Sequence, residues 1–391
     1  MSELRRIYLD NAATSWPKPE SVYCAVTHAM RELGAPAGRG TYAEASEVER
    51  LLRETRHETA RLLGVADSRS VIFTANGTDS LNLAIHGMLR PGDHVVTSMA
   101  EHNSTLRPLK QAQEHLGVTV TRVPCNGEGL VDPDDIRAAI QPHTKMIALV
   151  HVSNVTGAIQ PVTEVGKIAV DHQICYLVDA AQSLGHLPFD LDATQADLVA
   201  APGHKGLLGP LGSGILYIHP KRESELMPIR QGGTGTQSET DTQPDTLPDR
   251  FESGNHNVPS LLGLRAGIAY LTERGVTTIC HHEQQLAERL WQGLREIKGL
   301  QIYGPQNALQ RAGVVSLSID GYDPQELALL LDSHHRIQAR AGFHCAPLVH
   351  KQIGTNQQGG TLRLSVGALT TTAEIDTTVE AIGDIAAAHP F

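Results

Sequence analysis

Polar and charged side chains recur directly after the short apolar segments of this chain, each of which is predicted to be a β-strand. Lys205 follows one such segment, Asp179 ends another, and His102 follows a third. The carboxyl ends of parallel strands meet at one edge of a sheet, where α/β proteins gather their ligands. A lysine, a carboxylate and an imidazole at one edge can bind a carbonyl covalently, pair with a protonated ring nitrogen and move protons. Five neighbouring strand ends contribute, through Thr78, His102, Asn154, Asp179 with Gln182, and His204 with Lys205.

These residue types suit the parts of a phosphorylated pyridine aldehyde. Lys205 can form a Schiff base with the aldehyde, and Asp179 can pair with the pyridinium nitrogen, which keeps the ring an electron sink. Amide side chains can hold the ring hydroxyl, and an imidazole can lie on the ring face. Free N–H groups at a helix start, with the hydroxyl of Thr78, can bind phosphate. The convergence predicts such a cofactor more strongly than any single motif.

Seven apolar segments are predicted to be strands, and most are nearly continuously apolar, as is typical of strands covered on both faces. Helical patterns lie between them, among them residues 78–89, 134–140 and 162–170. This alternation indicates an α/β layer structure with a largely parallel sheet. The predicted strands are residues 70–74, 94–98, 119–124, 146–152, 174–179, 197–201 and 214–219.

The pattern changes after residue 230. Residues 231–248 are rich in Gly, Thr, Gln and Pro and are predicted to form a long loop. We expect a large domain over residues 16–260 and a smaller α+β domain made of residues 1–15 and 261–391. The elements predicted beyond the loop are helices at 259–273, 281–296, 324–331 and 373–387 and strands at 314–319 and 361–365.

The composition narrows the classes of protein to which the chain can belong. Its 391 residues carry 43 acidic and 32 basic side chains, a formal net charge of −11. This surplus of negative charge disfavours a phosphate-backbone partner, so no nucleic acid is expected. No apolar segment approaches the length that crosses a bilayer, and the first residues are charged rather than apolar. We therefore expect a cytoplasmic protein without a membrane partner.

Cysteine and histidine usage argues against a disulfide framework or a metal site. The five cysteines are odd in number and include no Cys-x-x-Cys pair. Among the 20 histidines, the adjacent pairs His281-His282 and His334-His335 would diverge on a helix. We predict no metal.

Nine short motifs follow one another along the chain. They are Tyr8-Leu9-Asp10-Asn11-Ala12-Ala13-Thr14, Asn76-Gly77-Thr78-Asp79-Ser80-Leu81-Asn82, Glu101-His102-Asn103, Ser153-Asn154-Val155-Thr156-Gly157, Val178-Asp179-Ala180-Ala181-Gln182, Gly203-His204-Lys205, Phe251-Glu252-Ser253-Gly254, Arg340-Ala341-Gly342-Phe343-His344-Cys345-Ala346 and Arg363-Leu364-Ser365. In this order they resemble class V aminotransferase-like enzymes and, within them, the cysteine desulfurases. The resemblance runs from residue 7 to about residue 366, and the ordered set is highly specific. It implies a fold-type I PLP-dependent transferase, with a mostly parallel seven-stranded sheet and a smaller C-terminal α+β domain.

The resemblance implies that the cofactor is pyridoxal 5'-phosphate (PLP). Lys205 would bind its aldehyde covalently and later move the proton of the substrate α-carbon. His102 would stack on the ring and act in acid–base steps, and Asp179 would pair with the ring nitrogen. The other implied cofactor contacts are Gln182 and Asn154 to the ring oxygen, Gly77, Thr78 and His204 to the phosphate, and Asn255 to the phosphate site of a second subunit in a homodimer.

The resemblance also implies the reaction, which converts L-cysteine to L-alanine. Arg363, helped by Asn154, would hold the substrate carboxylate, and Arg340 and Ala13 would lie beside the substrate. Cys345 would be the nucleophile, take the sulfur as a persulfide and deliver it to an acceptor protein, as in iron–sulfur cluster assembly. Arg340 and His344 would favour its reactive thiolate form. The other four cysteines are expected in the core.

Departures from the family pattern keep alternatives open. Pro202 stands where relatives place Ser or Thr, and proline lacks a backbone donor. Asn255-His256-Asn257-Val258 replaces the usual Thr-Pro-Asn-Thr, and Gly367-Ala368-Leu369 lacks the usual aromatic residue and asparagine. The alternatives are a selenocysteine lyase, a lyase that releases sulfide from cysteine or cystine, and a sulfur-carrier scaffold that no longer turns over.

Overall fold

The structure, a computed structural model, describes residues 6–38 and 40–388. The charged residues 1–5, on which the expectation of a cytoplasmic protein rests in part, lie outside the described residues, as do residues 389–391 of the expected small domain. Within the described ranges, no helix combines the length and the apolar character that would span a bilayer.

A seven-stranded sheet forms the centre of the large domain, which confirms the mostly parallel sheet predicted from the sequence. Six of its strands run in the same direction, and β8 is antiparallel to both of its neighbours. The connection from β7 to β8, residues 203–213, contains no helix and is too short for a parallel crossover. In sheet order the strands are β2 (Val71–Thr74), β8 (Gly214–Ile218), β7 (Leu198–Pro202), β6 (Cys175–Asp179), β5 (Thr144–Val150), β3 (His94–Ser98) and β4 (Thr119–Val123).

Alternate side chains of each strand enter two different hydrophobic cores, because successive residues of a strand point to opposite faces of the sheet. Val71 and Phe73 enter one core and Ile72 enters the other. Both faces are therefore buried, which explains the continuous apolar segments. One core includes side chains of α3 (Gly77–Met88) and α4 (Asn103–Leu116). The other includes side chains of α1 (Glu20–Glu32), α2 (Ala43–Leu62), α5 (Pro133–Ala138), α6 (Val162–Asp171) and α8 (Val258–Arg274).

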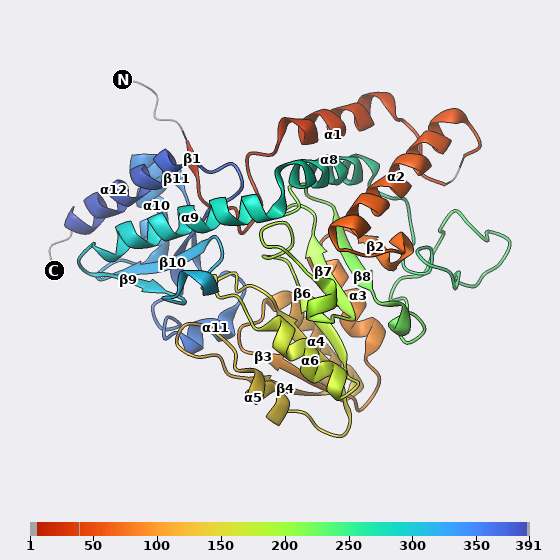
Figure 1. Ribbon diagram of the computed structural model, residues 1–391, viewed down its shortest axis with the longest axis horizontal. Helices are drawn as coiled ribbons and strands as arrows, with labels where there is room; N and C mark the ends of the chain where they lie inside the picture. Colours follow the sequence, from red (N-terminus) through yellow and green to blue (C-terminus); the bar gives the residue numbers. More distant parts are fainter. Residues whose placement is uncertain (1–5, 39, 389–391) are drawn as a thin grey trace.

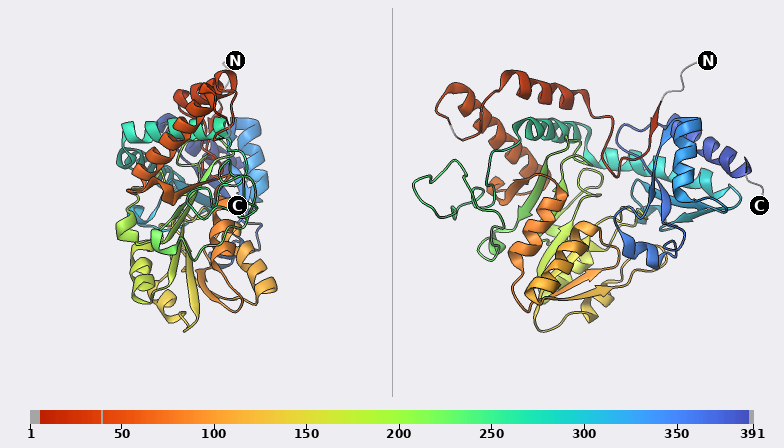
Figure 2. Two further views of the ribbon diagram at one scale, coloured as in Figure 1. Left: turned by 90° about the vertical axis from the view of Figure 1, so that its right-hand side faces the viewer. Right: turned by 180° about the vertical axis from the view of Figure 1, so that it is seen from behind.

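The small domain lies beside the large one, and Figure 1 shows most of its elements in blue, with α9 in turquoise and β1 in red. A four-stranded antiparallel sheet carries its own hydrophobic core, to which Ile7 and Leu9 from the start of the chain contribute. Figure 2 shows α1 and α2 at the opposite end of the molecule from this domain. The small domain is built from β12 (Arg340–Gly342), β13 (Thr361–Ser365), β10 (Val314–Ile319) and β9 (Leu300–Tyr303), from the pair β1 (Ile7–Tyr8) and β11 (Ile337–Gln338), and from α9 (Val276–Arg295), α10 (Pro324–His335), α11 (Pro347–Gln352) and α12 (Thr372–Ala388).

We propose one change to the expected domain division. Residue 261 lies inside α8, whose buried residues Leu261, Leu264 and Ile268 belong to the core of the large sheet. Helix α8 also contacts α1 and α2. A boundary after Arg274, between α8 and α9, keeps the core residues of α8 within the large domain.

The long loop predicted over residues 231–248 is confirmed, since residues 223–257 form neither helix nor strand. The C-terminal part of this loop is anchored by Glu252, which is buried. The Glu252 carboxylate accepts hydrogen bonds from Arg56 Nη1 and Nη2 at 2.6 and 2.7 Å and from the Phe73 N–H at 2.6 Å. One carboxylate thus joins the loop to α2 and β2.

Replacing Glu252 by alanine is expected to lower the free energy of unfolding by about 3–5 kcal/mol, because it leaves Arg56 buried without its partner. Urea denaturation measures the change. Glu114→Gln is the matched control, since its ion pair with Lys110 is exposed and worth under about 1 kcal/mol. Equal losses in the two variants would contradict the anchoring role.

Candidate active site

A cavity of about 440 Å³ opens at the carboxyl ends of β5, β6 and β7 and at the starts of α3 and α4. Eight of the nine residues expected around the cofactor line it, and Asn255 is the exception. Asn255 lies on a separate cavity with Arg230 and Gly254. The main cavity is lined by Gly77, Thr78, His102, Asn154, Asp179, Gln182, His204 and Lys205, together with Asn76, Ser104 and Pro202, among others.

Lys205 and Asp179 enter this cavity from adjacent parts of the sheet. Burial lowers the pKa of the Lys205 ammonium to about 8, against the opposing charge of Asp179. Burial raises the pKa of Asp179, although its carboxylate accepts the Ala181 N–H at 2.9 Å. A lysine with a lowered pKa is a competent nucleophile near neutral pH. A buried carboxyl group favours a cationic partner such as a protonated ring nitrogen.

His102 is held by the start of α4. Its Nδ1 accepts the Ser104 N–H at 3.0 Å, so the neutral ring carries its proton on Nε2. Burial, with the nearby positive charges of Lys205 and Arg340, lowers the pKa of His102 to about 4. The ring is therefore neutral near pH 7, which suits contact with an aromatic ring and acceptance of a proton.

The start of α3 forms the end of the cavity best suited to an anion. Asn76 caps this helix by accepting the Asp79 N–H, and the first N–H groups of a helix lack partners within it. The Thr78 hydroxyl lies 2.8 Å from that of Ser104. The Nδ1 atom of His204 is buried without a hydrogen-bond partner among the described residues. These donors fit a phosphate group.

Pro202 also lines this end of the cavity, so the residue that departs from the family pattern lies where a phosphate ligand was expected. A Cβ atom on Gly77 would lie 3.0 Å from the Pro202 ring. Glycine at position 77 therefore accommodates the proline.

Arg363 lies in β13 at the junction of the two domains, and its side chain is buried. Its Nη2 is 2.6 Å from the Asp10 carboxylate, and its Nη1 donates to the Asn154 carbonyl at 3.1 Å. Its Nε has no hydrogen-bond partner among the described residues. A guanidinium group has five N–H donors, and these two contacts use two of them, so donors remain for a carboxylate ligand. Ala13 lies in the turn after Asp10 and donates its N–H to the Asp10 carbonyl.

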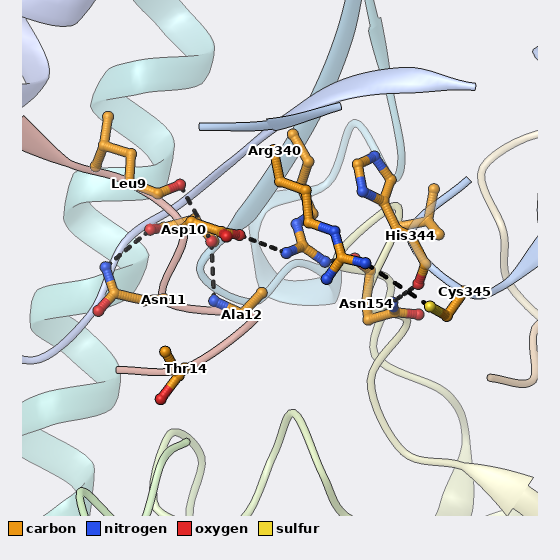
Figure 3. Close-up of polar contacts among 12 residues, drawn as sticks. Leu9, Asp10, Asn11, Ala12, Thr14, Asn154, Arg340, His344 and Cys345 are labelled. Atoms are coloured by element: carbon orange, nitrogen blue, oxygen red, sulfur yellow. Dashed lines mark hydrogen bonds and ion pairs between the residues drawn. The ribbon is translucent and has the colours of Figure 1, made fainter. Parts of the chain in front are cut away.

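Cys345 is exposed on the segment between β12 and α11, and Figure 3 shows it beside Arg340 and Asn154. Its Sγ lies 3.7 Å from Arg340 Nη2. The Cys345 carbonyl accepts the Asn103 N–H at 2.7 Å, next to His102. The Asn154 side chain donates to the His344 carbonyl at 2.6 Å. The backbone that carries the thiol is therefore held by hydrogen bonds from two sides of the site.

The backbone at the thiol is strained, because His344 and Cys345 adopt φ values of 48° and 60°. The structure corrects the expected role of His344. Its Nε2 contacts Thr361 at 3.0 Å, and burial lowers the pKa of the ring to about 2. His344 is uncharged and turned into the core, so Arg340 is the cation beside the thiol.

The remaining cysteines correct a second expectation. Cys125, Cys175 and Cys280 are buried as expected, but Cys24 is exposed on α1. Within residues 6–38 and 40–388, no group of three or more His, Cys, Asp or Glu side chains is arranged to hold a metal ion.

Acid is expected to destabilise the cofactor-free protein. Eight histidines have a pKa lowered by burial, and each has an unfolded pKa near 6.5. Between about pH 4 and pH 6.5 the unfolded chain therefore binds more protons, and the free energy of unfolding decreases as the pH falls. Glu101 and Asp179, whose pKa values burial raises, oppose this trend but are fewer. The pKa is lowered to about 4 for His102, His151, His204 and His350 and to about 2 for His344.

Urea midpoints at pH 7.5 and pH 5.0 test this expectation. We expect the lower midpoint at pH 5.0, and a midpoint that is equal or higher there would refute it.

Comparison with known proteins identifies the family to which this chain belongs. The aminotransferase class-V family matches residues 7–378. A probable cysteine desulfurase of Methanothermobacter thermautotrophicus is 37% identical over 385 residues, which cover 97% of this chain and 94% of that protein. A cysteine desulfurase of Haloferax volcanii is 32% identical over 383 residues, covering 96% and 88%. The chain belongs to the class-V aminotransferase family.

Two solved structures narrow the family further. The apo cysteine desulfurase of Thermococcus onnurineus NA1 matches with a TM-score of 0.92 and 34% identity over 98% of this chain and 95% of that one. The cysteine desulfurase CsdA of Escherichia coli, in an S-sulfonic acid form, matches with a TM-score of 0.87 and 28% identity over the same shares. Within the class-V aminotransferases the chain belongs with the cysteine desulfurases, and the fold-type I prediction is confirmed.

Sequence reasoning missed several residues of the site. Ser104, which contacts both His102 and Thr78, lies two positions after a residue that was singled out. Asp10 stands inside a recognised motif, yet its partner Arg363 is 353 residues away. Ser15 and Lys18, which contact the backbone of His204, follow that same motif.

Proposed function

We propose that this protein is a PLP-dependent cysteine desulfurase, which converts L-cysteine to L-alanine and transfers the sulfur to Cys345. The observation that carries the proposal is the placement of Cys345 beside Arg340 at the mouth of a site that also holds Lys205, Asp179 and Arg363. When bound, PLP supplies an electron sink conjugated to the substrate α-carbon. The donor set of the cavity fits this cofactor at its aldehyde, ring nitrogen and phosphate.

The chain's own residues then account for binding and orientation. Lys205 provides the amine that holds the cofactor aldehyde and accepts the proton from the substrate α-carbon. Asp179 stabilises a protonated ring nitrogen. One N–H of the Gln182 amide donates to the Ala12 carbonyl at 2.8 Å, and the second N–H would hold the ring oxygen. Thr78, His204 and the start of α3 bind the phosphate.

Arg363 and Arg340 orient the substrate between the cofactor and the thiol. Arg363 holds the substrate carboxylate by charge-assisted hydrogen bonds. Arg340 lies close enough to stabilise the Cys345 thiolate, the reactive form of cysteine.

The sulfur transfer balances without an external oxidant. The Cys345 thiolate attacks the substrate sulfur, so a sulfur–sulfur bond forms while the bond from that sulfur to the substrate β-carbon breaks. The electron pair of the broken bond stays with the β-carbon, which takes up a proton and becomes the methyl group of alanine. The persulfide on exposed Cys345 is accessible to an acceptor protein.

The proposal extends to the assembly and location of the enzyme. We propose a homodimer in which Asn255, exposed and away from the Lys205 cavity of its own chain, reaches the phosphate site of the second subunit. We also propose that the enzyme works in the cytoplasm and delivers sulfur for iron–sulfur cluster assembly.

Mass spectrometry of the PLP-loaded protein after incubation with L-cysteine tests the reaction. We expect one added sulfur atom on the peptide that contains Cys345 and one alanine released for each transfer. Pyruvate, ammonia and free sulfide without any sulfur on Cys345 would refute the persulfide route. An equal incubation with selenocysteine measures the substrate preference.

A further inference from the structure

Residues 10–18, which we call the N-terminal strap, contact three groups of the active site that lie far apart in the sequence. Asp10 forms the ion pair with Arg363, and the Ala12 carbonyl accepts the Gln182 side chain at 2.8 Å. Figure 3 shows the Asp10–Thr14 part of the strap passing beneath Arg340. The far end of the strap reaches the backbone of Lys205. The strap therefore spans the substrate side and the lysine side of the site.

Donors of the strap converge on the peptide group that joins His204 to Lys205. The His204 carbonyl oxygen lies 3.2 Å from Thr14 Oγ1, 3.1 Å from both the N and the Oγ of Ser15, and 2.8 Å from Lys18 Nζ. Ser15 Oγ also lies 2.9 Å from the Lys205 carbonyl. A carbonyl oxygen has two lone pairs, so the donors of the strap use the full hydrogen-bonding capacity of the His204 carbonyl.

Lys18 contributes an amine to this cluster. Its Nζ donates to Ser15 Oγ at 2.6 Å as well as to the His204 carbonyl, and burial lowers its pKa to about 7. Among the ion pairs formed within residues 6–38 and 40–388, none includes Lys18. Burying an ammonium group without a carboxylate is unfavourable. Lys18 Nζ instead contacts the His204 carbonyl directly, and it contacts the Lys205 carbonyl indirectly through Ser15 Oγ.

We propose that Lys18 is a positioning residue for Lys205. With Ser15 it fixes the peptide group between His204 and Lys205, and so sets the direction in which the Lys205 side chain enters the cavity. The catalytic consequence rests on the proposed function, whereas the positioning itself concerns the chain alone. A misplacement of about 1 Å in a reacting group can cost about 10²-fold in rate.

Lys205 reactivity in the cofactor-free protein tests the positioning directly. Reductive methylation with formaldehyde over a pH series is read by mass spectrometry of the Lys205 peptide. It gives the midpoint, which is the pH at which half of the Lys205 amine is protonated. In the wild type we expect a midpoint near 8, because burial lowers the pKa of Lys205 to about 8. In Lys18→Met and in Ser15→Ala we expect the midpoint to rise by about one pH unit, as a loosened side chain becomes better solvated.

Two further variants complete the comparison. Lys18→Arg keeps a charged donor and is expected to restore the wild-type midpoint at least in part. Lys167→Met removes an exposed lysine on α6 and is the matched control, expected to leave the midpoint unchanged. In the PLP-loaded enzyme, Lys18→Met is expected to lower kcat by about 10–100-fold while KM for cysteine changes less than about twofold.

A midpoint that stays at the wild-type value in both Lys18→Met and Ser15→Ala would overturn the positioning role, even if activity falls. A wild-type protein without desulfurase activity would refute the proposed function, but the midpoint shift would still report on Lys18. The two proposals can therefore fail separately.

Discussion

Replacing Lys205 by alanine is expected to lower the rate of alanine formation from cysteine by at least about 10⁴-fold, because the variant loses both the covalent link to the cofactor and the base for the α-proton. Lys205 is placed for both tasks, since it lines the same cavity as Asp179 and His102. Steady-state alanine release by the PLP-loaded protein measures the loss.

Borohydride reduction distinguishes this explanation from a loss of folding. In the wild type we expect a pyridoxyl group fixed on Lys205, and in Lys205→Ala we expect no fixed label. The Lys167→Ala protein, altered at an exposed residue of α6, is expected to retain both the label and the activity. A wild-type label on a different lysine would remove the basis of the mechanism.

The second large effect is expected at Cys345. Replacement by serine is expected to lower sulfur transfer from cysteine by at least about 10³-fold, because a hydroxyl group is a far weaker nucleophile than a thiolate. The binding of PLP to Lys205 should be unaffected, since Cys345 lies outside the lining of the cofactor cavity. The visible absorbance of the bound cofactor and the release of alanine are the two measurements.

Cys24 provides the matched control for this experiment, because it is the other exposed cysteine among the described residues. Cys24→Ser is expected to keep the wild-type rate and the wild-type sulfur load. Wild-type rates of sulfide release by Cys345→Ser, accompanied by pyruvate and ammonia in place of alanine, would identify a carbon–sulfur lyase instead of a desulfurase.

Elements with strong local patterns were predicted well from the sequence. Strands β3, β10 and β13 have the predicted bounds, because each is a short segment with several aliphatic residues that is almost entirely buried. The two- and three-residue strands β11 and β12 were not predicted, since segments so short carry no periodicity. They form only because β1 and β13 supply their hydrogen-bonding partners.

The cofactor side of the site was also predictable, and the substrate side was less so. Lys205, Asp179 and His102 lie together because parallel strands place their carboxyl ends at one edge of the sheet. The direction of the His344 ring and the placement of Asn255 on a separate cavity depend on packing between distant segments. No local pattern encodes such packing.

The sequence alone thus determined the sheet, its covering helices and the chemical groups around one cavity, because burial on two faces and the direction of the strands leave clear local patterns. The tertiary structure alone decided which groups hold those residues in place. Asp10 meets Arg363, and Lys18 meets the backbone of His204, only after the start of the chain has packed between the two domains. These contacts join residues more than 180 positions apart, and their geometry is set by the packing of whole domains rather than by the residues beside them in the chain.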